Sequence, residues 1–375
     1  MMKRILAALL SVLMVLSLVA CSTPVDNAPE TEPENVCAQR DYALHEVADK
    51  LKLMGRATVA SNGISSDHTA SGIEFEAYIQ GEFKFTVNCS ADTYFTVFVD
   101  GQRLEQRFEA KGEFVDREIV VGDLGEMALR NIRIVKQTEA NNSVATLKNL
   151  EFYGYLADKP KNKSLYIEFI GDSITAGYGN LWTKESPDPS NKSGTAVYQD
   201  GTQTYAFMAA ELLQADISVV SCSGIGIDKG YTNQNGNGYR MQDFYEMTSY
   251  TRSKTEAYDF ENVRVPDLVV INLGTNDMSV GSTEVDFKSG VRELIDFVRT
   301  SYDRKVPIVW AYGMMSDGRY QWVADVIAEL GGGAESLYMC ELVRNKEAGN
   351  GHPSLTAHNI ASQQLTGYLI NEGII

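Results

Sequence analysis

The stretch LYIEFIGDSIT, from Leu165 to Thr175, decides the fold and indicates where a site would lie in it. Residues 165–170 form an apolar run typical of a buried strand, and Gly171-Asp172-Ser173 ends that run abruptly. In open α/β sheets, ligands bind just beyond the carboxyl ends of the strands. A serine on a turn opened by glycine is therefore well placed for a nucleophile, although Ser173 could instead serve only as the cap of the following helix.

Residues 165–375 alternate between strand and helix patterns throughout. Near-continuous apolar runs are typical of parallel strands covered on both faces, and they occur at residues 165–170, 217–221, 268–273, 307–312 and 337–342. Apolar residues at helical spacing lie between these runs, at residues 202–213, 286–300 and 320–330, and after the last run, at residues 355–370. The alternation predicts an α/β domain with a doubly wound, parallel, five-stranded sheet.

Residues 40–157 follow a different pattern, with apolar and polar residues alternating at period two. Residues 73–79 and 83–87 each alternate in this way, and Asp100-Gly101 is a strong hairpin signal. Many short strands at regular spacing predict an all-β sandwich of the jelly-roll type. The polar, proline-containing residues 158–164 are the predicted linker between the two domains.

The first residues form a targeting segment. Lys3 and Arg4 precede a short apolar run that ends in Leu-Val-Ala-Cys21, which resembles the lipobox of bacterial lipoproteins. Residues 1–21 are therefore interpreted as a lipoprotein signal peptide with Cys21 as the lipidated residue, and an ordinary secretory signal is the alternative. Residues 22–39 are rich in proline and polar residues and predict a disordered tether. We expect an exported protein, lipid-anchored to the outer face of the bacterial membrane or secreted.

Charge and cysteine content exclude several classes of function. The net charge of −17 argues against nucleic acid as a partner, because phosphate binding requires basic patches. Neutral polymers such as polysaccharides are compatible with this charge. No C-x-x-C pair occurs, which argues against a zinc or redox site, so we expect neither a metal nor a cofactor.

Four short segments that follow the predicted strands carry chemically useful groups. They contribute the hydroxyl of Ser173, the backbone amide of Gly224, the carboxamide of Asn276 and the imidazole of His352. Parallel strands bring their carboxyl ends to the same edge of a sheet, so we expect these groups to converge. Acyl transfer needs such a set, because serine requires a base and the tetrahedral intermediate requires aimed N–H donors.

The four blocks, in this order, resemble the SGNH (GDSL-type) hydrolases over residues 165–375. With the preceding sandwich, the chain resembles carbohydrate esterase family 2, whose members remove acetyl groups from plant polysaccharides. The resemblance implies a flavodoxin-like sheet and no cofactor. It assigns the nucleophile to Ser173, the base to His352, and the oxyanion donors to Ser173, Gly224 and Asn276.

The sequence departs from the SGNH pattern at the acid that usually orients the histidine. That acid lies three residues before the histidine, and here the position is Gly349, followed by Asn350. Some members of family 2 use a backbone carbonyl instead, and the carbonyl of Asn350 is our candidate for this role. A Ser-His dyad is therefore favoured, and a triad completed by Glu347 or another acid is the alternative.

Two long insertions, residues 180–201 and 229–266, interrupt the α/β pattern and are rich in aromatic residues. Trp182, Tyr231 and Tyr239 are candidates for stacking on sugar rings, with packing of the loops as the equal alternative.

The sequence thus predicts a serine esterase that deacetylates polysaccharides or oligosaccharides of the acetylxylan or glucomannan type. An SGNH lipase or thioesterase is one alternative, and a non-catalytic, surface-anchored glycan-binding lipoprotein is another.

Overall fold

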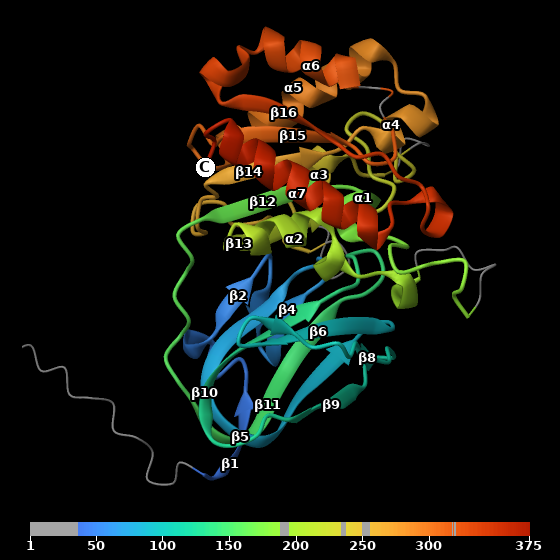
Figure 1. Ribbon diagram of the computed structural model, residues 1–375. Helices are drawn as coiled ribbons and strands as arrows, with labels where there is room; N and C mark the ends of the chain where they lie inside the picture. Colours follow the sequence, from blue (N-terminus) through green and yellow to red (C-terminus); the bar gives the residue numbers. More distant parts are fainter. Residues whose placement is uncertain (1–36, 188–194, 234–237, 250–255, 317, 319) are drawn as a thin grey trace, which may run out of the picture. The chain divides into compact units, whose positions relative to one another are not determined.

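Two kinds of sheet, one antiparallel and one parallel, make up the described part of the chain in the computed structural model (Figure 1). The structure describes residues 37–187, 195–233, 238–249, 256–316, 318 and 320–375. The predicted signal peptide with Cys21, and nearly all of the predicted tether, lie outside these residues.

The antiparallel strands precede the parallel ones in the chain and form a β-sandwich, as the period-two pattern predicts. Figure 1 shows them in blue to green. Their bounds are β1 (Gln39–Ala43), β2 (Lys52–Met54), β3 (Thr58–Ala60), β4 (Gly63–Ser66), β5 (Gly72–Cys89), β6 (Thr93–Val99), β7 (Gln102–Arg103), β8 (Phe108–Ala110), β9 (Asp116–Asp123), β10 (Ala128–Lys136) and β11 (Ala145–Leu156).

Strand β5 differs from the expectation of two separate strands at residues 73–79 and 83–87. It runs unbroken through both, because Gly81 adopts a left-handed φ of 68° and the pairing with β11 shifts at this point. Such a bulge inserts extra residues and bends a strand without ending it. After the Asp100-Gly101 hairpin the chain returns along β6 in two pieces, because β7 pairs with the end of β6 and β8 pairs with its start.

The second domain contains a five-stranded parallel sheet in the order β13-β12-β14-β15-β16, which is the flavodoxin-like arrangement. Each strand lies within two residues of its predicted position. The strands are β12 (Tyr166–Gly171), β13 (Asp216–Ser221), β14 (Leu268–Asn272), β15 (Ile308–Gly313) and β16 (Leu337–Leu342). The helices are α1 (Ser173–Ala176), α2 (Tyr205–Leu212), α3 (Met241–Tyr245), α4 (Thr275–Val280), α5 (Glu284–Ser301), α6 (Tyr320–Glu329) and α7 (Leu355–Asn371).

Helices cover both faces of this sheet. Side chains from α2 and α7 pack in one apolar cluster with Phe169, and side chains from α3, α5 and α6 pack in another with the next strand residue, Ile170. Successive residues of a strand point to opposite faces, so both faces of β12 are covered. This explains the near-continuous apolar runs in the sequence. The buried carboxylate of Glu168 in this strand accepts hydrogen bonds from the hydroxyls of Tyr302 and Ser218. Among the described helices, none has the length and apolarity needed to cross a membrane.

The sandwich and the α/β domain share part of their core. Phe98 of β6 stacks on Phe207 of α2, with ring centroids 5.7 Å apart, and Met54 and Val135 join the same cluster. Strand β11 ends at Leu156 and β12 begins at Tyr166, so the chain between them has no regular structure. Residues Val36–Ile375 nevertheless form one compact unit.

Candidate active site

The serine turn is built by three residues at the end of β12. Gly171 is required there, because a Cβ on it would lie 2.0 Å from the hydroxyl oxygen of Thr175. Asp172 caps helix α1, and its carboxylate accepts the N–H of Ile174 at 2.9 Å. Ser173 is the first residue of α1, so its own backbone N–H has no carbonyl partner within the helix. The turn therefore presents both the hydroxyl and the amide of Ser173 at the sheet edge.

His352 meets this serine from the other end of the domain. Its Nε2 lies 2.8 Å from Ser173 Oγ, and its Nδ1 lies 3.0 Å from the carbonyl oxygen of Gly349. A carbonyl can only accept, so Nδ1 carries the proton and Nε2 is free to accept from the serine hydroxyl. The pair has the arrangement that a nucleophile and its general base require.

The acceptor at Nδ1 is the carbonyl of Gly349, one residue earlier than the Asn350 carbonyl expected from the sequence. Residues 349–351 form a 3₁₀ turn in which Asn350 has a left-handed φ of 51°. This turn folds His352 back over Gly349, whose carbonyl also accepts the backbone N–H of His352 at 3.1 Å. The carbonyl of Asn350 also raises the pKa of His352, but by less than the carbonyl of Gly349 does.

No carboxylate of the described residues takes the place of the usual acid. Glu347, the alternative third member, is exposed and accepts a hydrogen bond from Asn345 at 2.9 Å. Burial lowers the pKa of His352 to about 4, although the carbonyls of Gly349 and Asn350 act in the opposite direction. The imidazole is therefore neutral, and able to act as a base, from mildly acidic pH upward.

The other two predicted oxyanion donors lie on the loop after β13 and in the first turn of helix α4. Gly224 has a left-handed φ of 83°, and its N–H has no protein acceptor within the described part of the chain. The carboxamide of Asn276 donates to the carbonyl of Ile225 at 2.8 Å and to Asp172 at 3.2 Å. Asn276 thus ties the Gly224 loop to the serine turn. Burial raises the pKa of Asp172 to about 7.

Asp277 supports the same loop, as the sequence predicts for a turn-bracing residue. Its carboxylate accepts backbone N–H groups from Ile227 at 3.1 Å, Asp228 at 2.8 Å and Lys229 at 3.0 Å. Burial raises the pKa of Asp277, and these three hydrogen bonds oppose the increase. The loop after Gly224 is therefore held by a buried carboxyl group.

The three aromatic candidates for substrate binding have different surroundings. Trp182 is only 6% exposed, so its ring is packed inside the domain and offers little surface to a sugar. Tyr231 is 57% exposed, and its Cβ would lie 3.2 Å from a Cβ on Gly224. Tyr239 is half-buried, and its carbonyl accepts the hydroxyl of Thr232. Only Tyr231 combines an exposed ring with a position beside the predicted oxyanion donors.

Tyr178 also belongs to the site, although we did not single it out from the sequence. Its ring lies against that of His352, with centroids 4.5 Å apart and the planes inclined by 36°. Its hydroxyl accepts a hydrogen bond from Asn350 at 3.0 Å, and its backbone N–H donates to Ser173 at 3.0 Å. Its position only five residues after Ser173 was the available signal.

Glu139 was also missed, and no sequence signal could have identified it because it belongs to the sandwich. It follows β10, is 1% exposed, and lies against the loop that carries Gly224. Its carboxylate accepts the backbone N–H of Ser223 at 2.8 Å and the hydroxyl of Ser223 at 2.8 Å. A residue of the N-terminal domain therefore contacts the candidate oxyanion loop.

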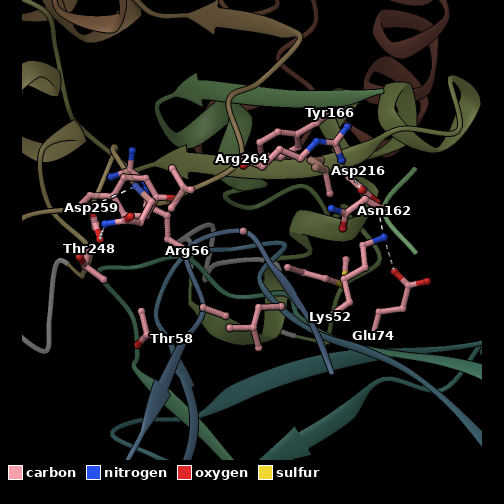
Figure 2. Close-up of a pocket in the computed structure, with 18 of the residues that line it drawn as sticks. Lys52, Arg56, Thr58, Glu74, Asn162, Tyr166, Asp216, Thr248, Asp259 and Arg264 are labelled. Carbon is pink, nitrogen blue, oxygen red and sulfur yellow. Dashed lines mark hydrogen bonds and ion pairs between the residues drawn. The ribbon is translucent and has the colours of Figure 1, made fainter. Parts of the chain in front are cut away.

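A cavity of about 530 Å³ lies at the opposite edge of the parallel sheet (Figure 2). Tyr166 and Asp216, the first residues of β12 and β13, line it together with charged residues of the sandwich. Lys52 lies 2.6 Å from Asp216 and 3.1 Å from Glu74, so its charge is already paired. Neither Ser173 nor His352 lines this cavity, which we interpret as part of the domain interface.

Comparison with protein families gives a match to the GDSL-like Lipase/Acylhydrolase family over residues 167–329. The matched region contains Ser173, Gly224 and Asn276, and it ends before His352.

Among curated proteins, the chain is 30% identical over 325 residues to the cellulase/esterase CelE of Acetivibrio thermocellus. It is 26% identical over 218 residues to an acetylxylan esterase / glucomannan deacetylase of Cellvibrio japonicus. These alignments cover 83% and 54% of this chain, but only 38% and 58% of the relatives.

Among solved structures, a family two carbohydrate esterase from Clostridium thermocellum in complex with cellohexaose matches with a TM-score of 0.77 and 27% identity. The alignment covers 87% of this chain and 100% of that chain. The acetyl xylan esterase Est2A from Butyrivibrio proteoclasticus matches with a TM-score of 0.78 at 19% identity, over 90% of this chain and 100% of that chain. The Est2A match bears on the fold alone. Both alignments extend through the sandwich as well as the α/β domain.

Proposed function

This chain contains a GDSL-like lipase/acylhydrolase domain, and from this premise we propose that it is a serine esterase that removes O-acetyl groups from polysaccharides or oligosaccharides. The observation that carries the proposal is the 2.8 Å contact between Ser173 Oγ and His352 Nε2 at the sheet edge. Substrates of the acetylxylan or glucomannan type are supported by the names of the curated relatives from Cellvibrio japonicus.

The first half of the proposed reaction forms an acetyl-enzyme. Ser173 Oγ attacks the acetyl carbonyl carbon while His352 Nε2 takes the hydroxyl proton. The carbonyl oxygen becomes an oxyanion, which the amides of Ser173 and Gly224 stabilise. The carboxamide of Asn276 joins them by exchanging its 3.2 Å donation to Asp172 for one to the oxyanion. The intermediate then collapses, the bond to the sugar oxygen breaks, and the imidazolium returns its proton to that oxygen.

The second half releases acetate. Water replaces the sugar, His352 removes one of its protons, and the oxygen attacks the acetyl carbon bound to Ser173. Collapse of this second intermediate returns the proton to Ser173 Oγ and frees the product. The Gly349 carbonyl holds Nδ1–H throughout, so a single tautomer serves both halves.

Acetate release from a panel of substrates tests the proposed function. We expect the purified protein to release acetate from acetylated xylan, glucomannan or cello-oligosaccharides and to prefer aryl acetates to aryl esters of longer acids. Ser173→Ala is the matched control and should retain the fold but no measurable release.

Two outcomes would replace the proposal with one of its alternatives. A preference for long acyl chains would indicate a lipase or thioesterase. Binding of glycans without hydrolysis, and without labelling of Ser173 by a serine-directed phosphonate, would indicate a non-catalytic glycan-binding protein.

We propose in addition that the protein is exported and anchored by a lipid on Cys21. The support is the basic start, the short apolar run and the cysteine that follows Leu-Val-Ala. Fractionation of cells that express the chain tests this location. Cys21→Ser should move the protein from the membrane fraction to the soluble or secreted fraction, and an unchanged distribution would contradict the anchor.

A further inference from the structure

We propose that Glu139 of the sandwich is a positioning residue for the esterase reaction, because it holds the Ser223–Gly224 segment in the conformation that stabilises the oxyanion. This inference rests on the proposed function, since it concerns the same reaction at the same site. It assigns to the N-terminal domain a direct influence on catalysis in addition to any support of the fold.

The contacts of Glu139 concentrate on the residue immediately before Gly224. One carboxylate oxygen accepts the backbone N–H of Ser223, and the other accepts the hydroxyl of the same residue, both at 2.8 Å. Ser223 is therefore held through both its main chain and its side chain. The next amide in the chain is the N–H of Gly224, whose direction depends on how Ser223 is fixed.

The carboxylate is also held by Gln199 of the α/β domain, and the loop that carries it is fixed within the sandwich. The oxygen that accepts the Ser223 hydroxyl also accepts Gln199 Nε2 at 2.8 Å, and the backbone N–H of Glu139 donates to Gln199 Oε1 at 3.2 Å. The ammonium group of Lys136 donates to the carbonyl of Thr138 at 2.7 Å and to that of Asp67 at 2.8 Å. This network limits the freedom of the loop between β10 and β11.

The type of partner distinguishes Glu139 from ordinary interdomain charges. Its carboxylate oxygens accept hydrogen bonds from the neutral groups of Ser223 and Gln199, while the structure gives it no direct ion pair among the described residues. Burial raises the pKa of Glu139, and its hydrogen bonds from Ser223 and Gln199, together with the nearby ammonium group of Lys136, oppose the increase. A hydrophobic or amide side chain would join the two domains more cheaply, so the geometry points to a requirement for two strong acceptor atoms at this loop.

The experiment compares Glu139→Ala and Glu139→Gln with the wild type by steady-state kinetics on an aryl acetate. We expect kcat to fall about 10- to 100-fold for Glu139→Ala, less than the loss on deleting an oxyanion donor, because Gly224 is displaced and not removed. KM should change less than threefold, since ground-state binding does not use the oxyanion. Glu139→Gln keeps one acceptor oxygen and should recover part of the activity.

Binding of an oxyanion mimic separates positioning from general support of the fold. A trifluoromethyl ketone forms a charged adduct with Ser173, so its inhibition constant should rise by the same factor by which kcat/KM falls. The matched control is Glu211→Gln, which removes a carboxylate that accepts two hydrogen bonds from Arg133 of the sandwich, both at 2.7 Å. That variant should lower the melting temperature but leave kcat and the inhibition constant within twofold of the wild type.

Each outcome discriminates. Wild-type kcat in Glu139→Ala, or an equal kcat loss in Glu211→Gln, would overturn the inference while leaving the esterase itself established. If Glu139→Ala does not fold, Ser223→Ala provides the second measurement, because it deletes one of the two contacts and leaves the carboxylate in place. A Ser223→Ala enzyme with unchanged kcat and inhibition constant would then overturn the inference. Failure of the wild type to hydrolyse any ester would instead overturn the proposed function.

Discussion

The sandwich meets the α/β domain differently at the two edges of the parallel sheet. At the edge where β12 and β13 begin, basic residues of the sandwich pair with acidic residues of the α/β domain, as Lys52 does with Asp216 (Figure 2). At the edge where these strands end, Glu139 meets neutral donors of the loop next to Gly224. Ion pairing at the first edge fixes the domains together. At the second edge Arg103 of the sandwich also pairs with the buried Asp200 at 2.7 Å, but the contacts of Glu139 go to the loop that carries Gly224 and bear on the shape of the candidate active site.

The largest effect on the rate is expected from removing the general base at the edge that carries the candidate active site. We expect His352→Ala to lower kcat by roughly four orders of magnitude, because Ser173 then has no proton acceptor. Circular dichroism and aryl acetate kinetics would measure fold and rate together. His358→Gln is the control, since His358 is buried, accepts the N–H of Tyr205 at 3.1 Å and lies outside the catalytic pair. A similar rate loss in that control would contradict the assignment of the base.

Breaking the ion pair at the opposite edge should affect stability and not rate. Lys52 is 7% exposed, and Lys52→Met would leave Glu74 without its cation. We expect the free energy of unfolding to fall by about 3 kcal/mol. This value is at the low end for a broken buried ion pair, because Arg264 still neutralises Asp216 in the variant. Urea denaturation would measure it. Lys50→Met removes the more exposed pair with Asp158 and should cost less than about 1 kcal/mol. A tenfold change in kcat for Lys52→Met would show that this edge also influences catalysis, which contradicts the expected difference between the edges.

The pH dependence of the rate tests whether the active edge lacks a carboxylate partner for His352. The base must be neutral, and burial lowers the pKa of His352 to about 4, so kcat/KM should stay high down to about pH 5 and fall below it. If His352 had an unperturbed pKa, kcat/KM at pH 5 would be roughly 30-fold lower than its plateau value at high pH. An acid limb near pH 6.5 or above would indicate a carboxylate partner. Initial rates in overlapping buffers would decide between these outcomes.

The smallest effect is expected for Asn350→Ala. The main orienting contact comes from the carbonyl of Gly349, and the side chain of Asn350 reaches only the hydroxyl of Tyr178. We expect kcat/KM to fall by about threefold or less, chiefly because alanine is less suited than asparagine to the left-handed φ of 51°. Tyr178→Phe removes the same hydrogen bond without altering the turn and serves as the control. A hundredfold loss in both variants would show that this pair, more than the carbonyl, orients His352.

The sequence was sufficient for the parallel sheet because its information is local. Strands buried on both faces must be continuously apolar, and parallel topology then brings Ser173 and Gly224 to one edge. The placement of Asn276 and His352 follows from the same rule. The carbonyl that faces His352 could not be read in this way, because it depends on the left-handed φ of Asn350 within a single turn.

Two further outcomes, the packing alternative at Trp182 and the contact of Glu139 that was not predicted, have equally physical causes. Trp182 has the aromatic character of a sugar-binding residue, but its burial depends on how the loop folds back. Glu139 is separated from Ser223 by 84 residues and by a domain boundary, so no periodicity or motif connects them. The strand pattern of the sequence was enough to predict the parallel sheet. It was not enough to predict the contact between Glu139 and Ser223, which depends on how the two domains are placed.

The stacking of Phe98 on Phe207 has a consequence for how the protein unfolds. Both rings belong to one apolar cluster that spans the sandwich and the α/β domain, so separating the two domains would expose this cluster to water. Heat should therefore melt both domains in a single cooperative transition. A segment that resembles a separable module in the sequence is, in energetic terms, one half of a single folding unit.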